Sequence, residues 1–286
     1  MRRATLLSLV VGIILVTLKG IAWSMTDSLS MMSSLADSML DVIASTINFM
    51  AVRYALQPPD HEHRFGHGKA EDLATLVQAI FICGSGVFLV IEGIHRIISP
   101  STIYNSAIGI GVMIVSIVLS LGLVGYQRHV VRKTASGVVA ADALHYFVDF
   151  LTNVGVIVAL CLTAGLGIKV ADPFIALLIA AYILYGSFTI GQSAFQNLMD
   201  REFSDAEREE IKRIVCADSE VIGLHELRTR RSGIHGFIQF HLDLDQNMSL
   251  RRAHEISDRV EDALMKAFAN TDIIIHQDPL HGDKTP

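Results

Sequence analysis

Side chains that bind metals lie in two apolar stretches of the sequence, where charged groups are rare. The stretch AADALHYFVDFLT carries Asp142, His145 and Asp149, whose spacings of three and four residues place them on one face of a helix. The stretch LADSMLD carries Asp37 and Asp41, again four residues apart. If both stretches lie in a membrane, each ionisable group costs roughly 2.5–3.5 kcal/mol. A divalent cation bound between these groups offsets this cost. We therefore interpret Asp37, Asp41, His145 and Asp149 as one metal site.

The ligand set indicates what the site does. One nitrogen and three oxygens suit the tetrahedral shell of Zn²⁺, and without a thiolate the ion can leave again. Protons compete with metal for such ligands, and histidine titrates near physiological pH, so the set predicts exchange of metal for protons. The alternative is that Asp37 or Asp41 caps a broken helix or hydrogen-bonds to a neighbour. Asp142 and Asn153 share the face of His145, where they either orient the ligands or have a structural role.

The composition divides the chain into an apolar part and a charged part. The 286 residues have a mean hydropathy of +0.45 and are 51% apolar, too apolar for a soluble protein of this size. Of the 52 charged residues, 29 lie in residues 201–286, where 17 are acidic and 12 basic. We therefore predict a membrane domain at 1–200 and a soluble domain at 201–286. The acidic tail favours cations over nucleic acid as partners, and the three scattered cysteines indicate no disulfide framework.

Six apolar segments are each long enough to cross a membrane. They cover about 4–24, 31–56, 73–98, 107–126, 137–164 and 172–195. The first is too long for a signal peptide and is not followed by a small-residue cleavage site, so we interpret it as a span. Lys19 within it is expected to extend toward the membrane surface. Basic residues gather at Arg2, Arg3 and in alternate connections (53–69, 128–133), which predicts that both termini are cytosolic.

The C-terminal part is predicted to be a small α+β domain with the order αββαβ. Helices are expected at 204–217 and 249–269, and strands at 221–230, 237–245 and 272–276. Ser204 and Glu207 have the spacing of a capping box. The second strand alternates apolar with polar residues, so one of its faces is buried. This pattern predicts a three-stranded sheet with helices on one face.

Two further groups of histidines and acids lie outside the predicted spans. The loop PPDHEHRFGHGKAED offers Asp60, His63 and His67, with a fourth position left to water. An exposed polar loop that binds no metal is an equal alternative. A third group is scattered over the soluble domain and consists of His225, His241, His254, His276 and Asp278. Its spacing does not show that the side chains converge, so unrelated surface histidines are an equal alternative.

Two other functions must be weighed against metal transport. An intramembrane metalloenzyme is disfavoured because His225-Glu226 and His254-Glu255 lack the second histidine of HExxH, and four protein ligands leave no position for water. We therefore predict that the protein is not an enzyme. A passive divalent cation channel would instead line a pore with acids and conduct without proton coupling. We favour an antiporter that exchanges Zn²⁺ for protons, and the same ligands are compatible with Fe²⁺, Cd²⁺ or Mn²⁺.

Four motifs together resemble the cation diffusion facilitator family, over nearly the whole chain. They are LADSMLD, DHEHRFGHGKAE, ADALHYFVD and IIIHQDP. The match is closest to the family's bacterial zinc and ferrous-iron efflux pumps. The resemblance implies a homodimer in the cell inner membrane, with six transmembrane helices and a metallochaperone-like cytosolic domain. It also implies alternating access, in which a proton gradient drives metal export.

The resemblance also assigns roles to residues that match the family's motifs. It implies a transport site at Asp37, Asp41, His145 and Asp149, and a loop site at Asp60, His63 and His67. It implies a cytosolic site similar to a binuclear zinc site at His225, His241, His254, His276 and a bridging Asp278. Lys69 and Asp200 match a pair that interlocks charges near the dimer interface.

Overall fold

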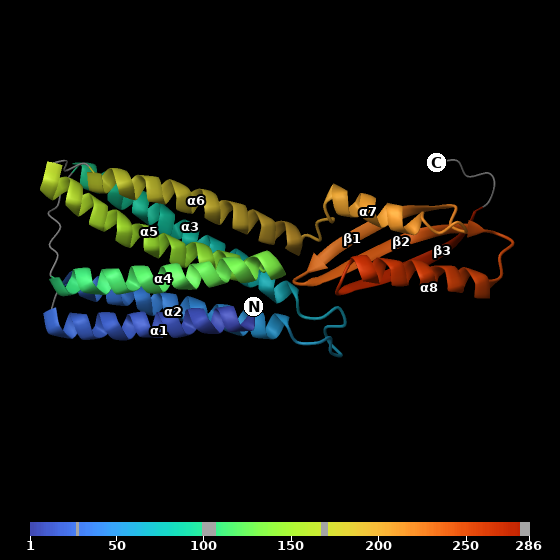
Figure 1. Cartoon of the computed structure of the whole chain (residues 1–286), viewed down its shortest axis with the longest axis horizontal. Coiled ribbons are helices and arrows are strands. Elements are labelled where there is room, and N and C mark those ends of the chain that lie inside the picture. The colour runs from blue at the N-terminus through green and yellow to red at the C-terminus, as the bar shows by residue number, and fades with distance from the viewer. Residues whose placement is uncertain (27–28, 99–106, 167–170, 281–286) are drawn as a thin grey trace. The chain divides into compact units, whose positions relative to one another are not determined.

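The fold is described from a computed structural model that covers residues 1–26, 29–98, 107–166 and 171–280. Contacts divide the chain into two compact units, Met1–Phe195 and Gln196–Pro286, which are described separately. The first unit is helical, and the second combines helices with a sheet (Figure 1).

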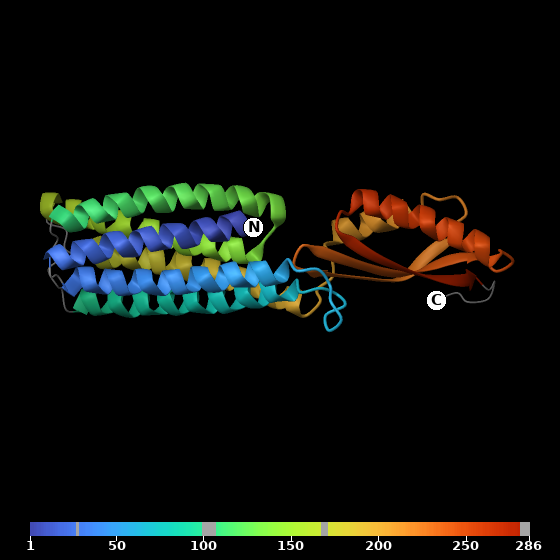
Figure 2. The ribbon, with the colours of Figure 1, turned by 90° about the horizontal axis from the view of Figure 1, so that it is seen from below.

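Six helices among the described residues are long and apolar enough to cross a membrane, as predicted. They run side by side along one axis (Figures 1 and 2). Their bounds are α1 Arg2–Thr26, α2 Leu29–Ala55, α3 Lys69–Ile98, α4 Ala107–Thr134, α5 Gly137–Leu166 and α6 Ala171–Leu198. α4 continues past the predicted end near residue 126 because no helix breaker occurs before Ala135, which has a left-handed φ of 51°.

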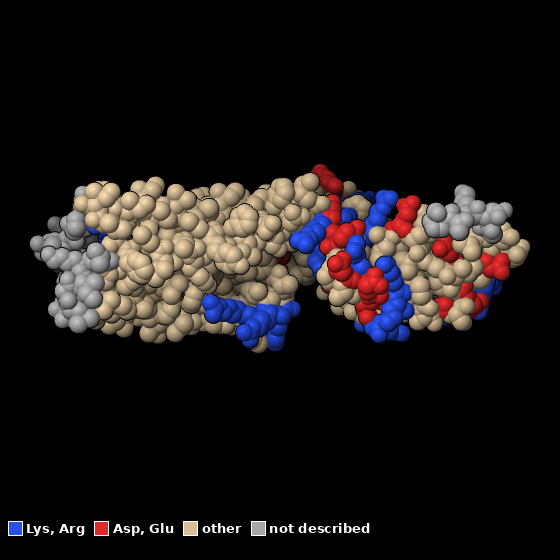
Figure 3. Space-filling view, turned by 90° about the horizontal axis from the view of Figure 1, so that it is seen from above, with Lys and Arg blue, Asp and Glu red and all other residues tan. Residues whose placement is uncertain are grey.

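The outside of this bundle is suited to lipid. Large side chains are exposed there, for example Phe81, Phe88 and Tyr185, with exposed fractions of 70%, 68% and 75%. The surface of the helical unit in Figure 3 is almost free of charged side chains except near one end. Inside the bundle, small residues allow close approach: a Cβ at Gly186 would lie 2.9 Å from a methyl carbon of Leu144. The helices therefore pack through small residues and present large apolar ones outward.

Most of the basic residues of the helical unit gather at one end of the bundle. The N-terminus, the α2–α3 connection and the α4–α5 connection all lie at this end (Figures 1 and 2). These segments carry Arg2, Arg3, Arg53, Arg64, Lys69, Arg132 and Lys133. This distribution is the one that the positive-inside rule uses to orient membrane proteins.

The second unit has the predicted αββαβ order. Its elements are α7 Asp205–Val215, β1 Gly223–Ser232, β2 His235–Asp245, α8 Leu250–Ala267 and β3 Thr271–Leu280. The strands form one sheet in the order β1-β2-β3, antiparallel between β1 and β2 and parallel between β2 and β3. β3 runs past its predicted end at His276 to Leu280, and it tolerates Pro279 because it is an edge strand.

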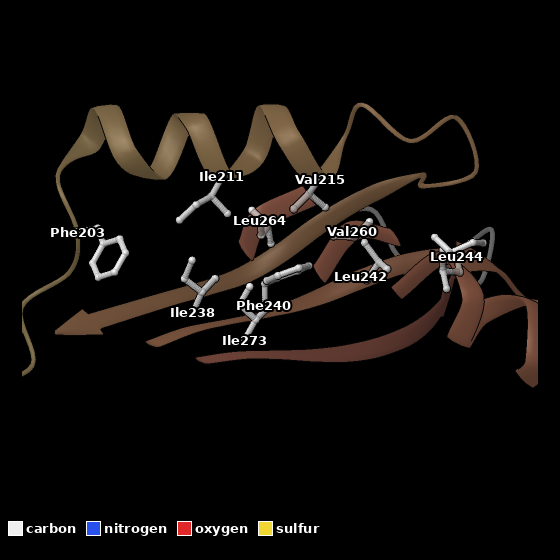
Figure 4. Packing of buried hydrophobic residues seen from close by; sticks show 11 residues of the cluster. Phe203, Ile211, Val215, Ile238, Phe240, Leu242, Leu244, Val260, Leu264 and Ile273 are labelled. Atoms are coloured by element: carbon white, nitrogen blue, oxygen red, sulfur yellow. The ribbon is translucent and has the colours of Figure 1, made fainter. Parts of the chain in front are cut away.

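One face of this sheet is covered by α7 and α8. The alternating residues Ile238, Phe240 and Leu242 of β2 are at most 1% exposed and pack against apolar residues of both helices (Figure 4). Ser204 and Glu207 form the predicted capping box at the start of α7. Because apolar residues occupy the covered face, the polar residues of the strands lie on the opposite face.

Candidate metal centres

The first cluster lies between α2 and α5 within the helical bundle. His145 Nε2 is 2.8 Å from Asp41 Oδ1 and 3.8 Å from Asp149 Oδ2. One ligand atom from each of these three residues lies within 4.8 Å of the others. The four-residue spacing in α5 places His145 and Asp149 on the same face. The structure therefore brings together three of the four residues predicted for this site.

Asp37 is the predicted ligand that lies outside this group. It precedes Asp41 by about one turn of α2, which is a distance of about 6 Å along the helix axis, and it is exposed. Its charge still acts on Asp149 of α5. Asp37 therefore lies near the cluster without contributing a ligand atom to it, and its role as the fourth ligand stays a prediction.

Asp142 belongs to a different polar contact, about one turn nearer the start of α5 than His145. Its carboxylate is 1% exposed and accepts hydrogen bonds from Ser8 of α1, Gln127 of α4 (2.6 Å) and Asn48 of α2 (3.2 Å). Asn153 donates to the carbonyl of the residue one turn earlier in α5. These contacts assign Asp142 to the packing of four helices, which was one of its two predicted roles.

Lys19, which was expected to extend toward the membrane surface, bonds to the neighbouring helix α2. Its ammonium donates hydrogen bonds to Ser38 Oγ (2.6 Å) and to the carbonyl of Ser34 (3.3 Å), both in α2. Sequence reasoning missed this contact because the spacing of a lone lysine gives no partner. The bonds place a positive charge beside the helix that carries Asp37 and Asp41.

The second cluster lies in the connection between α2 and α3 and gathers all three predicted residues. One ligand atom each from Asp60, His63 and His67 lies within 4.8 Å of the others. Asp60 Oδ2 is 3.2 Å from His67 Nε2, and Asp60 Oδ1 is 3.5 Å from His63 Nδ1. Gly66 allows the turn between the histidines by adopting a φ of +79°.

The backbone of this loop holds the carboxylate of Asp60 in place. Backbone N–H groups of His63 and Glu62 donate to its Oδ1 over 2.7 Å and 2.9 Å. These bonds, with that from His63 the stronger, hold the pKa of Asp60 below its ordinary value. The His67 side chain is 2% exposed, and its buried Nδ1 has no hydrogen-bond partner within the described residues. An ionised carboxylate beside a buried imidazole suits a divalent cation.

The third cluster lies on the polar face of the sheet. His225, His241 and His276 are direct neighbours in the register of β1, β2 and β3. The carboxylate of Asp278 contacts all three, with distances of 3.4 Å to His225 Nε2, 2.7 Å to His241 Nδ1 and 3.2 Å to His276 Nε2. The bond with His241 lowers the pKa of Asp278. Strand pairing therefore brings ligand atoms of His225, His241 and Asp278 within 4.8 Å of one another, whereas His276 contacts Asp278 but lies outside this group.

Two residues change the composition of this cluster. Sequence reasoning missed Asp243, whose Oδ1 is 3.1 Å from His225 Nδ1. Its position two residues after His241 on the same strand face was the signal for it. His254 of α8 lies apart from the row: its Nδ1 is 3.5 Å from Asp258 Oδ1, and it is outside the group of ligand atoms within 4.8 Å.

The two residues of the predicted charge interlock lie in different units. Lys69 is the first residue of α3. Asp200 has a left-handed φ of 56°, and its Oδ1 is 3.6 Å from Arg230 Nη1 of β1. Their interlock across a dimer therefore stays a prediction.

Comparison with known proteins matches both units to one family. Residues 5–199 match the cation efflux transmembrane domain, and residues 203–280 match the cytoplasmic domain of cation efflux proteins. The cation-efflux pump FieF of Shewanella oneidensis is 46% identical over 97% of this chain and 94% of its own length. FieF of Salmonella paratyphi A is 45% identical over 97% of this chain and 92% of its own length.

One of the similar solved structures is a C-terminal domain. The metal-bound C-terminal domain of the CzcD transporter from Thermotoga maritima is 26% identical and has a TM-score of 0.26. It is covered completely and corresponds to 29% of this chain. Since the family match extends over both units and the FieF pumps align along almost their whole length, the protein belongs to the cation efflux, or cation diffusion facilitator, family of membrane transporters and is of the FieF type.

Proposed function

We propose that the protein is an antiporter that exports a divalent metal, chiefly Zn²⁺, from the cytosol in exchange for protons. Fe²⁺ and Cd²⁺ are further substrates that the same ligands accept. The observation that carries this proposal is the cluster of Asp41, His145 and Asp149, which gathers a nitrogen and carboxylate oxygens between two membrane-type helices. Ionisable groups in such a position mark ion pathways because burial in a membrane is costly without a function.

The geometry of the cluster supports proton exchange. His145 Nε2 and Asp41 Oδ1 are 2.8 Å apart, a distance at which a proton lies between them. A metal that binds both atoms must displace this proton. In the cytosol-facing state the ligands take up the metal, and in the outward-facing state protons displace it. Asp37 completes the shell when the metal is bound.

The two other clusters are proposed to serve regulation. Asp60, His63 and His67 bind metal at the end of the bundle where basic residues gather. The sheet cluster, with His254 as an additional ligand, senses cytosolic metal and joins two cytosolic domains (201–286) into a homodimer. The transport domain is residues 1–200. Both termini are cytosolic, and the membrane is the cell inner membrane; the basic residues at one end of the bundle support this orientation.

Zinc uptake into proteoliposomes, with and without a pH gradient, tests the proposal. We expect gradient-driven uptake by the wild type and its loss in Asp149→Asn, which keeps the side-chain shape but removes the charge. Glu92→Gln is the matched control, because it neutralises an acid of α3 that pairs with Arg96 away from the cluster. Zinc uptake that does not depend on the pH gradient would favour a passive channel. Undiminished uptake in Asp149→Asn would show that the transport site lies elsewhere.

A further inference from the structure

Lys19 carries a positive charge next to the cluster of acids, and the proposed mechanism does not use it. Its ammonium is held by two acceptors of α2, Ser38 Oγ at 2.6 Å and the Ser34 carbonyl at 3.3 Å. Ser38 is 1% exposed and directly follows Asp37 in α2. The lysine is therefore fixed at the level of the helical turn that carries the first predicted ligand.

The charge of Lys19 acts on acids of both helices that form the cluster. It attracts Asp37 of α2 and Asp149 of α5. The other ionisable groups near the cluster are Asp41 of α2 and His145 of α5, which bond to each other, and the buried Asp142 of α5, which accepts hydrogen bonds from Ser8, Gln127 and Asn48. Within the described residues, the ammonium of Lys19 bonds to Ser34 and Ser38 and not to a ligand atom, so it acts through charge rather than coordination.

Counting these charges shows what the lysine changes. The count covers the predicted ligands and leaves out Asp142, which is hydrogen-bonded to Ser8, Gln127 and Asn48 in a separate contact. Among the ligands, the carboxylates of Asp37, Asp41 and Asp149 carry three negative charges when ionised, and neutral His145 adds none. The ammonium reduces the total to minus two. A bound divalent cation then makes the site neutral, whereas a monovalent cation leaves it negative and a trivalent one leaves it positive. A net charge is costly to hold in a membrane, so neutrality favours the divalent ion.

We propose that Lys19 is a fixed counter-charge that matches the transport site to divalent cations and weakens their binding enough to permit release. This inference rests on the proposed transport site. A lysine that only ties α1 to α2 would act differently. Its loss would disturb the position of α2 and weaken metal binding, whereas loss of a counter-charge strengthens the attraction between the acids and the cation.

Equilibrium zinc binding to the full-length protein in detergent separates these two roles. The background carries His67→Ala and His241→Ala, which disable the other two clusters, and Asp149→Ala in this background gives the blank. We expect Lys19→Met to bind zinc about tenfold more tightly at the membrane site, and Lys19→Arg to bind like the background. Ser38→Ala removes a hydrogen bond of the ammonium but keeps its charge, so its affinity should stay within about twofold of the background.

Transport by Lys19→Met in proteoliposomes gives a second measurement. Tighter binding should lower the zinc concentration for half-maximal uptake and also lower the maximal rate, because release becomes slower. Weaker or unchanged zinc binding in a folded Lys19→Met protein would overturn the role of the counter-charge. If Asp149→Ala binds as much zinc as its background, the transport site itself is wrong and this inference falls with it.

Discussion

Zinc should stabilise the C-terminal unit through the row of histidines on its sheet, and His241→Ala should abolish that effect. His241 is the central member of the row. Its ring lies 5.0 Å from that of His225 and 4.6 Å from that of His276, and its Nδ1 is 2.7 Å from Asp278. Without it, the group of three ligand atoms loses its central nitrogen and keeps only His225 and Asp278, so the shell around one ion is incomplete.

The size of the effect follows from mass action. A ligand present at about 100 times its Kd stabilises the folded state by about 2.7 kcal/mol. A domain of this size shifts its Tm by about 4–8 °C for each kcal/mol. Zinc should therefore raise the Tm of the wild-type unit by about 10–20 °C. In metal-free buffer His241→Ala should change stability by only about 0.5 kcal/mol, because the side chain is on the partly exposed face.

Thermal unfolding of the fragment 196–286, followed by circular dichroism with zinc or with a chelator, measures this. The fragment contains the whole apolar core of the unit. His235→Ala is the matched control, since this histidine of β2 is exposed and outside the group of ligand atoms. The reasoning would be refuted by a wild-type Tm that zinc leaves unchanged, or by a His241→Ala fragment that keeps the full increase.

Three further predictions concern stability and packing. Hydrogen bonds from the backbone and from Arg259 lower the pKa of Asp218 in the folded protein. These bonds stabilise the folded state at pH values above the ordinary carboxyl pKa of about 3.9. Their contribution is lost as the pH falls through the lower pKa that Asp218 has in the folded protein. Arg259→Met should therefore reduce the loss of unfolding free energy on acidification, and an acid titration identical to the wild type would contradict this. Phe240→Ala, at a 1% exposed core position, should destabilise the fragment by about 3–5 kcal/mol in urea unfolding, and a cost below about 1 kcal/mol would mean that the site collapses. Gly186→Leu should separate α5 from α6, because even a Cβ at this position would lie 2.9 Å from a methyl carbon of Leu144. The Tm of the protein in detergent should therefore fall. A Tm equal to that of the wild type would refute the close contact.

The sequence predicted those parts of the molecule that depend on local pattern. Spans followed from apolar length, and the buried face of β2 followed from alternation. The face shared by His145 and Asp149 followed from their spacing. Spacing along one helix does not give depth relative to another helix, which is why Asp37 was expected in the cluster and lies outside it.

Contacts that depend on the register between elements could not be predicted from the spacing of residues in the sequence. His225, His241 and His276 are far apart in the sequence and meet only because the three strands pair at those positions. Asp243 joins them through the same strand pairing, although its position two residues after His241 on β2 could have indicated it. Lys19 bonds to α2 because the two helices run antiparallel side by side, which no property of α1 alone indicates.

The three clusters contain the same types of ligand, but the backbone holds these ligands with different rigidity in each cluster. This difference argues for different roles. The histidines of the sheet are fixed by strand hydrogen bonds, so their spacing cannot change without unpairing the sheet. Asp60 is fixed by backbone N–H groups of its own loop. The membrane cluster instead joins Asp41 of α2 to His145 of α5, whose side chains bond directly across two separate helices. A small shift between these helices changes the ligand spacing, and so the affinity for metal. The membrane cluster is therefore the one suited to taking up an ion and releasing it, whereas the other two are suited to holding one.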